Sequence, residues 1–519
     1  MSQHQHRGLA VVVAVALGLV GCGADELSGI CIDDDTCGAG TVCAFGLCVD
    51  ANDARLGTVD IEIEPVMSSG LPVQSLFDVD ANDADDGRVE VSLERGVSLS
   101  GAVVDDTDPE DAHSALPATV QARPAQSIAG RVRAPTTTTT GDFQLLALRG
   151  AQYRLAVTPD DATIPPLFDD ADFVDDDALS IDDGSVIVRG RVTAGSGVEA
   201  LAVVGFEVLI TSEGRRVSSL GLTGSDGSFE IALRRQVTGA NLEVRATADI
   251  RGFPSVTVAL DVDSDDVDLG EISLGAVSAP VPVRGTVKDR GGTPARDAVV
   301  TFRGRVGAGI FTSRVTADDN GAFTAQLLPG DYLAAAVAVQ DDRAGLLVQA
   351  LTVGAAVDDV ALVLPSRVDV SVRVTTSEGV PVSSTSVVFQ RVGDTSGLAE
   401  PVLDGAQPLF LAAADVDGNA VLAVDAGRYR VTLQPPRGSG APAFSALVTV
   451  DGTFTRDFVL PQQNVLAGVV KDDGGLPAPG AFVRVFSQLT DELGRAIFLG
   501  EAIAGDDGSF AVSVPDLTP

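Results

Sequence analysis

Residues 283–302 read VRGTVKDRGGTPARDAVVTF. Apolar and polar residues alternate at both ends of this stretch, which is the pattern of a strand buried on one side. The Gly-Gly-Thr-Pro in the middle has the composition of a turn. Residues 469–485, VVKDDGGLPAPGAFVRV, repeat the arrangement. The two stretches therefore predict paired β-structure at widely separated parts of the chain.

Three short motifs recur at intervals of roughly 90 residues, about the size of one β-sandwich. Each repeat opens on Gly-x-Val, continues to Gly-x-Phe after acidic residues or Asn, and in three repeats reaches a tyrosine beside a glycine. The opening glycines are Gly101, Gly190, Gly285 and Gly468, the phenylalanines are Phe143, Phe229, Phe323 and Phe510, and the tyrosines are Tyr153, Tyr332 and Tyr429. In the fourth repeat Ala420 takes the phenylalanine position, and Ser371 is interpreted as replacing the opening glycine.

The recurring aromatic residues are predicted to be core residues rather than ligand contacts. A core residue must fill the same hole in every repeat, whereas a binding residue need not recur. We therefore expect Phe323 and Tyr332 to be buried. The tyrosine hydroxyl is expected to bond to the backbone near the preceding turn, as in a tyrosine corner.

Together the motifs resemble the carboxypeptidase regulatory-like domain, a transthyretin-like β-sandwich found in many bacterial surface proteins. The resemblance covers most of residues 98–519 and is clearest in the third and fifth repeats. It implies an all-β fold, with a tandem array of small antiparallel β-sandwiches after a short disulfide-rich N-terminal segment. It implies no peptidase activity, because no peptidase domain accompanies the repeats.

The repeats and the N-terminal features divide the chain into eight parts. The ends are unusual, because residues 57–97 look like the second half of a repeat and residues 462–519 like a first half. The N-terminal half either packs on its neighbour or leaves the fifth repeat to be completed by something else. The parts are a signal peptide (1–21), a lipidated Cys with a Cys-rich module (22–56), a partial unit (57–97), units 1 to 4 (98–186, 187–279, 280–365 and 366–461), and an incomplete unit 5 (462–519).

The N-terminus has the features of an export signal. Arg7 precedes twelve apolar residues, Leu9 to Val20, which are too few to span a bilayer as a helix. The run ends in Leu-Val-Gly-Cys22, which resembles the lipobox of bacterial lipoproteins. The resemblance implies cleavage before Cys22 and acylation of its thiol. It places the protein in the cell envelope, as an outer-membrane lipoprotein facing the periplasm or the cell surface.

Four further cysteines stand close together after the lipobox. An exported protein meets an oxidising environment, so two disulfides are predicted among them, with the connectivity open. A metal site is the alternative, although the spacing contains no Cys-x-x-Cys pair. The four residues are Cys31, Cys37, Cys43 and Cys48.

Composition argues against two classes of function. The chain has 73 Asp and Glu against 35 Lys and Arg, a net charge of −38, which disfavours nucleic acid. After removal of the signal, His113 is the one histidine left, so neither a catalytic triad nor a His-based metal site is expected. We predict no catalytic residues, no cofactor and no metal.

The sequence therefore predicts a membrane-anchored, non-catalytic array with a structural, adhesive or protein-binding role. The alternative is a carbohydrate-binding surface protein, because starch-binding-like domains share this sandwich. Acidic clusters near residues 78–86, 160–183 and 261–268 are either solvated linkers or calcium sites between units. Lys288 and Lys471 lie near strands where related adhesin domains form isopeptide cross-links, but the third unit offers no Glu to assist one.

Overall fold

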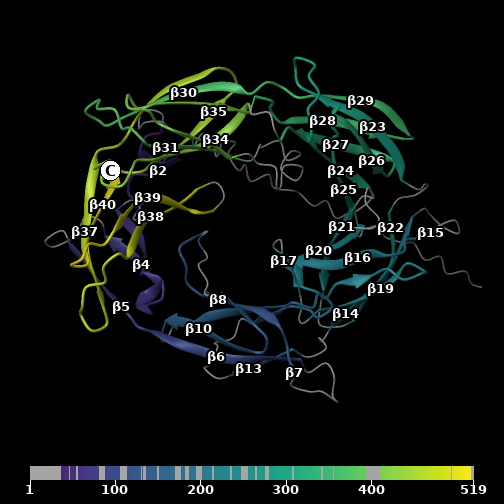
Figure 1. The fold of residues 1–519 in the computed structure, drawn as a ribbon, viewed down its shortest axis with the longest axis horizontal. Coiled ribbons are helices and arrows are strands. Elements are labelled where there is room, and N and C mark those ends of the chain that lie inside the picture. Colours follow the sequence, from purple (N-terminus) through teal and green to yellow (C-terminus); the bar gives the residue numbers. More distant parts are fainter. Residues whose placement is uncertain are drawn as a thin grey trace, which may run out of the picture.

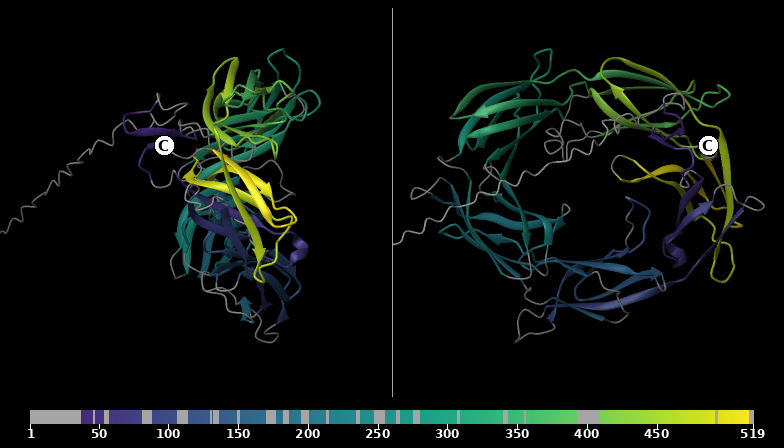
Figure 2. Two further views of the ribbon diagram at one scale, coloured as in Figure 1. Left: turned by 90° about the vertical axis from the view of Figure 1, so that its left-hand side faces the viewer. Right: turned by 180° about the vertical axis from the view of Figure 1, so that it is seen from behind.

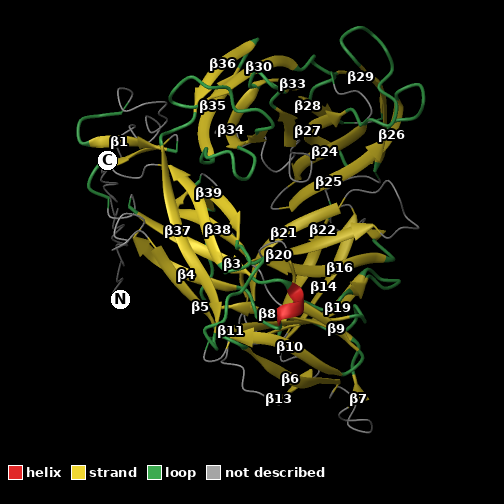
Figure 3. Cartoon of the chain, turned by 60° about the vertical axis from the view of Figure 1, so that its left-hand side comes forward, coloured by secondary structure: helices red, strands yellow, loops and turns green. Residues whose placement is uncertain are grey.

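The computed structural model describes residues 37–515 apart from 46, 54–56, 81–87, 106–113, 130, 132–135, 149–150, 170–176, 182–185, 195–200, 213–214, 234–236, 247–254, 263–265, 275–279, 307–308, 340–342, 355, 393–408 and 492–493. Cys22, Cys31 and His113 therefore lie outside the described residues. The described chain consists of strands, turns and loops with one short 3₁₀ helix, η2 (Met67–Ser69), so the all-β prediction is confirmed (Figure 3). No helix in this part of the chain is long and apolar enough to cross a membrane.

The third repeat shows the plan of one sandwich. Its strands are β23 (Val281–Lys288), β24 (Val299–Val306), β25 (Gly309–Thr316), β26 (Ala322–Leu327), β27 (Gly330–Val337), β28 (Leu347–Val353) and β29 (Val357–Val363). One layer has the order β26-β23-β29, and the other has the order β25-β24-β27-β28. β29 runs parallel to β23, and the other pairs are antiparallel. Alternate side chains from both layers are buried between them.

Sandwiches 1, 2 and 4 follow the same order. Sandwich 1 has β6 (Gly96–Asp105), β7 (Ser114–Ala115), β8 (Ala118–Pro124), β9 (Thr136–Thr139), β10 (Asp142–Leu148), β11 (Tyr153–Pro159), β12 (Leu167–Asp169) and β13 (Asp177–Ile181). Sandwich 2 has β14 (Val186–Ala194), β15 (Leu201–Ala202), β16 (Phe206–Ser212), β17 (Arg215–Arg216), β18 (Gly221–Leu222), β19 (Ser228–Leu233), β20 (Val237–Ala246), β21 (Ser255–Val262) and β22 (Val267–Ser273). Sandwich 4 has β30 (Val368–Thr375), β31 (Ser386–Arg391), β32 (Leu409–Ala413), β33 (Asn419–Val424), β34 (Gly427–Gln434), β35 (Phe444–Val450) and β36 (Phe454–Val459).

The fifth sandwich is built from both ends of the chain. The C-terminal part supplies β37 (Gln463–Asp472), β38 (Phe482–Thr490), β39 (Ala496–Ile503) and β40 (Ser509–Pro515), and the N-terminal part supplies β3 (Thr58–Glu64), β4 (Gln74–Asp80) and β5 (Arg88–Leu93). β3 pairs antiparallel with β38, and β5 pairs parallel with β37. The two layers, β40-β37-β5 and β39-β38-β3-β4, match those of sandwich 3. The two half-repeats recognised in the sequence therefore complete each other.

This split sandwich closes the chain into a ring of five sandwiches (Figure 1). The layers that contain β6, β14, β23, β30 and β37 lie on the outside of the ring, and the layers that contain β8, β16, β24, β31 and β38 face its centre (Figure 1). Between sandwiches 2 and 3 the inner layers merge, because β21 pairs with β25 in one continuous sheet. The other neighbours meet through hydrogen bonds and ion pairs without a shared sheet, such as the backbone bond from Leu220 of sandwich 2 to Ala162 of sandwich 1.

The Gly-x-Val and Gly-x-Phe motifs of one repeat lie on neighbouring strands and pack against each other. Gly285 on β23 stands opposite Phe323 on β26. A Cβ atom at Gly285 would lie 2.6 Å from the phenyl ring and 2.2 Å from the carbonyl oxygen of Val360. Glycine at this position therefore makes the space that the core phenylalanine occupies. Gly468 and Phe510 repeat the arrangement in sandwich 5.

Sandwich 4 solves the same packing problem differently, and here the sequence interpretation is corrected. The amide of Val374 donates to the carbonyl oxygen of Gly418, as the amide of Val287 donates to that of Gly321. Because Gly285 lies two residues before Val287, the position of the opening glycine in sandwich 4 is Val372 and not Ser371. Val372 stands opposite Ala420. Where the other repeats place phenylalanine over glycine, sandwich 4 places alanine over valine, and both residues are buried.

The prediction that Phe323 and Tyr332 are core residues is confirmed. Phe323 is 4% exposed and Tyr332 is 3% exposed. The Tyr332 hydroxyl donates to the carbonyl oxygen of Leu328 at 2.8 Å, and Tyr429 donates to that of Asp425 at 2.7 Å. In sandwich 1 the geometry is inverted, because the Tyr153 hydroxyl accepts from the amide of Leu148 at 2.9 Å. Each hydroxyl thus ties its strand to the preceding turn.

The Cys-rich segment folds as a hairpin of β1 (Thr41–Ala44) and β2 (Leu47–Asp50), which lies on one side of the ring (Figure 2). A disulfide joins Cys37 to Cys48, and Cys43 is also disulfide-bonded. Phe45 at the hairpin turn is 8% exposed and belongs to the core of sandwich 5. The hairpin is therefore docked on the ring where the chain ends meet.

Candidate functional site

The place where the ring closes holds a chain of alternating charges, which we call the closing junction. Glu62 on β3 stands opposite Arg484 on β38, and the Arg484 Nη1 lies 3.1 Å from Glu62 Oε1 and 2.7 Å from Glu64 Oε2. Arg131 reaches over from sandwich 1 and bonds Glu62 through two nitrogens, at 2.7 and 3.2 Å. The strand pairing that completes sandwich 5 therefore also assembles this ion-pair network.

The network continues into sandwich 4. Glu501 on β39 accepts from Arg437, which follows β34, with Nε at 2.6 Å. The Arg484 Nε lies 3.6 Å from the other oxygen of Glu501. Arg131, Glu62, Arg484, Glu501 and Arg437 thus alternate in charge across sandwiches 1, 5 and 4. Three parts of the chain that are remote in sequence are held together by one set of ion pairs.

Burial makes the inner part of this network the strongest. The Glu62 side chain is 4% exposed and that of Arg484 is 16% exposed, whereas Arg437 is 50% exposed at the rim. Burial alone would lower the pKa of Arg484, but its bonds to Glu64 and Glu62 raise that pKa above the ordinary value. Removing one partner of a buried pair leaves an uncompensated charge and typically costs about 3–5 kcal/mol. The inner pairs are therefore structural.

Aromatic rings support the same arginines. The guanidinium carbon of Arg131 lies 4.7 Å from the ring centroid of Phe486, and those of Arg437 and Arg484 lie 5.2 and 5.5 Å from that of Phe482. Phe486 packs edge-on against Phe498 with centroids 5.7 Å apart. The planar guanidinium groups are held in position on both sides, by carboxylates and by ring faces.

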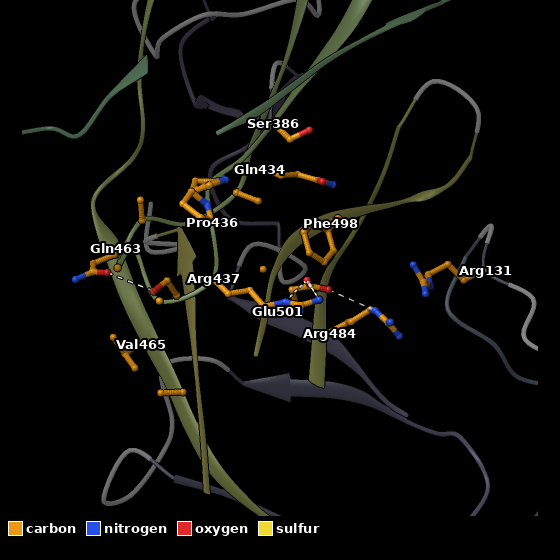
Figure 4. Close-up of a pocket in the computed structure, with 18 residues that line it drawn as sticks. Arg131, Ser386, Gln434, Pro436, Arg437, Gln463, Val465, Arg484, Phe498 and Glu501 are labelled. Atoms are coloured by element: carbon orange, nitrogen blue, oxygen red, sulfur yellow. Dashed lines mark hydrogen bonds and ion pairs between the residues drawn. The ribbon is translucent and has the colours of Figure 1, made fainter. Parts of the chain in front are cut away.

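A cleft of about 710 Å³ opens between sandwiches 4 and 5 at this place, and we call it the junction cleft (Figure 4). Arg131, Arg484 and Phe498 lie toward one end, and Gln463 and Val465 toward the other (Figure 4). The remaining lining residues are Ser386, Gln434, Pro435, Pro436, Arg437, Gly438, Gly440, Ala441, Ala443, Gly500, Glu501, Ala511 and Ser513. Three arginines and one glutamate line a cleft in a chain whose net charge is −38.

A smaller cleft of about 280 Å³ adjoins it and shares Arg131, Gln434 and Phe498. It adds Arg430 and Arg495 from sandwiches 4 and 5. Arg495 is bonded to Asp491 and to Gln390, while the buried Arg430 donates to the carbonyl oxygen of Phe45 at 2.9 Å and to the Ser445 hydroxyl at 3.1 Å. The arginines that gather here come from both sides of the junction.

The residues singled out in the sequence do not lie in these clefts. The Cys37–Cys48 disulfide is in the hairpin, and the lipidation site Cys22 stays a prediction outside the described residues. Lys471 Nζ lies 2.6 Å from Glu90 Oε1 on the parallel strand β5, where the two form an ion pair. Among the described residues, no group of three His, Cys, Asp or Glu is arranged to hold a metal ion.

Several described members of the acidic clusters accept hydrogen bonds from nearby groups. Asp161 accepts from the amide and hydroxyl of Thr163, at 2.9 and 2.7 Å. Asp266 accepts from the amide of Ile187 at 2.9 Å. These bonds lower the pKa of both carboxyls, and the bond from the backbone amide is the largest cause in each. They tie loops to strands within or beside each sandwich.

Comparisons with known proteins give a likeness of fold. No family model and no curated protein matches the sequence. The Bacillus anthracis TIE protein is 9% identical, with 66% of this chain and 68% of that chain covered and a TM-score of 0.17. A streptococcal ancillary pilin is 10% identical, with 52% and 97% covered and a TM-score of 0.22, and the major pilin subunit of Bacillus cereus is 10% identical, with 53% and 99% covered and a TM-score of 0.15.

The closing junction was not found from the sequence. Glu62 and Glu64 alternate with Ile61 and Ile63, which predicts a strand with one charged, solvent-facing side. On that side Glu62 is instead covered by the side chains of Arg484 and Arg131. The available signal was the matching pair of half-repeats, because a strand from one half must face a strand from the other.

Proposed function

We propose that this protein is a non-catalytic lipoprotein of the cell envelope, anchored through Cys22, whose ring of carboxypeptidase regulatory-like sandwiches has a structural, adhesive or protein-binding role. The observation that carries the proposal is the split fifth sandwich, which turns a string of repeats into a closed ring. The ion-pair network, the guanidinium–aromatic contacts and the clefts of the described chain all lie where sandwiches meet. An architecture of this kind presents surfaces and holds their spacing.

The docked Cys-rich hairpin supports the anchored arrangement. Phe45 is buried in the core of sandwich 5, and its carbonyl oxygen accepts from Arg430 of sandwich 4. An acyl group on Cys22 would thus be attached a short stretch of chain away from the closing junction. The anchor would hold the ring at the place where its ends are joined.

The anchor is tested by Cys22→Ser. The variant should lose metabolic labelling with a fatty acid and should leave the detergent phase in a detergent-partition assay, since acyl chains are the expected anchor. A melting curve checks that the ring still folds. A variant that still fractionates with membranes as the unaltered protein does would refute the proposal. The soluble variant is then the bait for capture of a partner from the cell surface.

Carbohydrate binding is a second candidate, and the junction cleft favours it. Its volume of about 710 Å³ lies within the roughly 300–1,000 Å³ typical of small-molecule sites. Amide, hydroxyl and guanidinium groups line it beside Phe498, a combination that suits a sugar's hydroxyls and its apolar face. A glycan array probed with the soluble protein tests this candidate. An array without any hit would exclude it and leave the anchored-ring proposal to the Cys22 experiment.

A further inference from the structure

We propose that the junction cleft binds an acidic oligosaccharide, one whose sugars carry carboxylates, and that this ligand is recognised by the closed ring. The proposal rests on carbohydrate binding as the second candidate function, and it names the ligand class. The first support is position. The cleft is lined by sandwich 4, by strands of both layers of sandwich 5 and by Arg131 of sandwich 1, and Arg131 is held there by its bonds to Glu62 on the N-terminal strand β3.

The second support is charge. The lining arginines Arg131, Arg437 and Arg484 are bonded to Glu62, Glu64 and Glu501, and the adjoining cleft adds Arg430, Arg495 and Asp491. Five arginines therefore meet four carboxylates here. A chain with 73 acidic and 35 basic residues has few such surfaces to offer an anion. A guanidinium has five N–H donors in a planar fork that matches a carboxylate, so an arginine paired with one glutamate can still donate to a ligand.

The third support is the shape and chemistry of the walls. Phe498 and the consecutive prolines Pro435 and Pro436 supply apolar surface in the cleft that carries the arginines. Gln434 and Gln463 supply amides that can donate to and accept from sugar hydroxyls. A ligand with hydroxyls, an apolar ring face and carboxylates uses all three kinds of group, whereas an inorganic anion uses the arginines alone.

The test uses the full-length Cys22→Ser protein and isothermal titration calorimetry. The probes are a trimer of galacturonic acid and, as the neutral counterpart, a trimer of galactose. We expect the acidic trimer to bind at least roughly tenfold more tightly than the neutral one. One hydrogen bond to a charged group typically contributes more binding free energy than a tenfold change in affinity requires. Its affinity should fall as salt is raised, because ions screen exposed charges.

Two variants and a matched control locate the site. Arg437→Gln should weaken the acidic trimer by roughly tenfold. Gln434→Glu adds a repelling charge and should weaken binding of the acidic trimer more than binding of the neutral one. Arg284→Gln is the control, because Arg284 on the outer strand β23 is similarly exposed and forms a similar pair with Asp358 at 2.9 Å. Melting temperatures should stay close to that of the parent protein, since exposed pairs contribute little stability.

Three results would overturn the inference. Equal affinity for the neutral trimer would leave carbohydrate binding standing but remove the preference for acidic sugars. Unchanged affinity in Arg437→Gln and Gln434→Glu would place binding elsewhere. Absence of binding by both trimers would remove the proposed ligand class, and a glycan array without hits would remove the second candidate function with it.

Discussion

Replacing Ile61 by alanine tests whether the N-terminal strands are a structural part of the C-terminal sandwich. Ile61 on β3 is fully buried, stands opposite Val485 on β38, and belongs to the core that contains Leu499 and Phe510. Truncation of a buried isoleucine to alanine typically costs about 2–5 kcal/mol, from lost burial and the cavity left behind. That is a large share of the roughly 5–15 kcal/mol that keeps a domain folded.

The expected loss of amide protection appears in residues 463–515, far from Ile61 in the sequence. In Ile61→Ala, amide hydrogen exchange in residues 463–515 should become faster by about 30-fold or more, since each 1.4 kcal/mol of opening free energy is a factor of ten. Peptide-level exchange measured by mass spectrometry resolves this range from the rest of the chain. Sandwiches 2 and 3, on the far side of the ring, should keep their protection.

Ile231→Ala is the matched control. Ile231 on β19 of sandwich 2 is equally buried at 1% exposure, and its loss should deprotect sandwich 2 while leaving residues 463–515 unchanged. If Ile61→Ala leaves the exchange of residues 463–515 unaltered while the control behaves as described, the C-terminal half is self-sufficient. The reasoning about a split sandwich would then be wrong.

Four further outcomes follow from the same structure. Thiol alkylation without reductant should label none of the cysteines, and two or more labelled thiols would contradict two disulfides; the residues concerned are Cys31, Cys37, Cys43 and Cys48. Tyr332→Ala should lose about 3–5 kcal/mol of stability, and because β21 and β25 form one sheet, calorimetry should show sandwiches 2 and 3 destabilised together rather than sandwich 3 alone. Burial raises the pKa of Tyr332 to about 12, so its stabilising contribution is complete below pH 10 and is lost between pH 10 and 12. Ultraviolet titration of phenolate should show ionisation centred well above pH 10, and an ordinary tyrosine curve centred near pH 10 would contradict it. If the acidic clusters bind calcium, millimolar calcium should raise the melting temperature, whereas melting that is insensitive to EDTA supports solvated linkers.

The repeat and its core could be predicted because their signals are local. The pairing of Gly285 with Phe323 and the burial of Tyr332 lie within one motif or between two motifs of the same repeat. Alternation along each strand then indicates which side is buried. The opening position of sandwich 4 was assigned to Ser371 instead of Val372 for a physical reason as well. Sandwich 4 packs alanine against valine there, so it has no glycine to mark the register of the strand.

The arrangement of the sandwiches could not be predicted because it depends on distant contacts. Arg131 and Glu62 are separated by 69 residues, and Arg484 and Glu62 by 422, and no motif marks any of the three. The pairing of β21 with β25 depends on two strand edges that read like many others in the sequence. The continuous sheet joins sandwiches 2 and 3, which a tandem array of small sandwiches does not by itself imply.

Ring closure sets the free energy gained by burying apolar side chains against the entropy lost when the chain ends are joined and ordered. Bringing together two chain ends separated by several hundred residues costs about 5 kcal/mol in loop entropy, and less if the intervening sandwiches are stiff. Completing sandwich 5 buries Val59, Ile61, Ile63, Val91 and Leu93 almost fully, and burying one such side chain contributes roughly 1.5–3 kcal/mol. This apolar term and the ion pairs of Glu62 act in the same direction, against the closure entropy and the conformational entropy of ordering β3, β4 and β5. Closure and the folding of sandwich 5 are then a single event, so a ligand held across the junction cleft would stabilise both together.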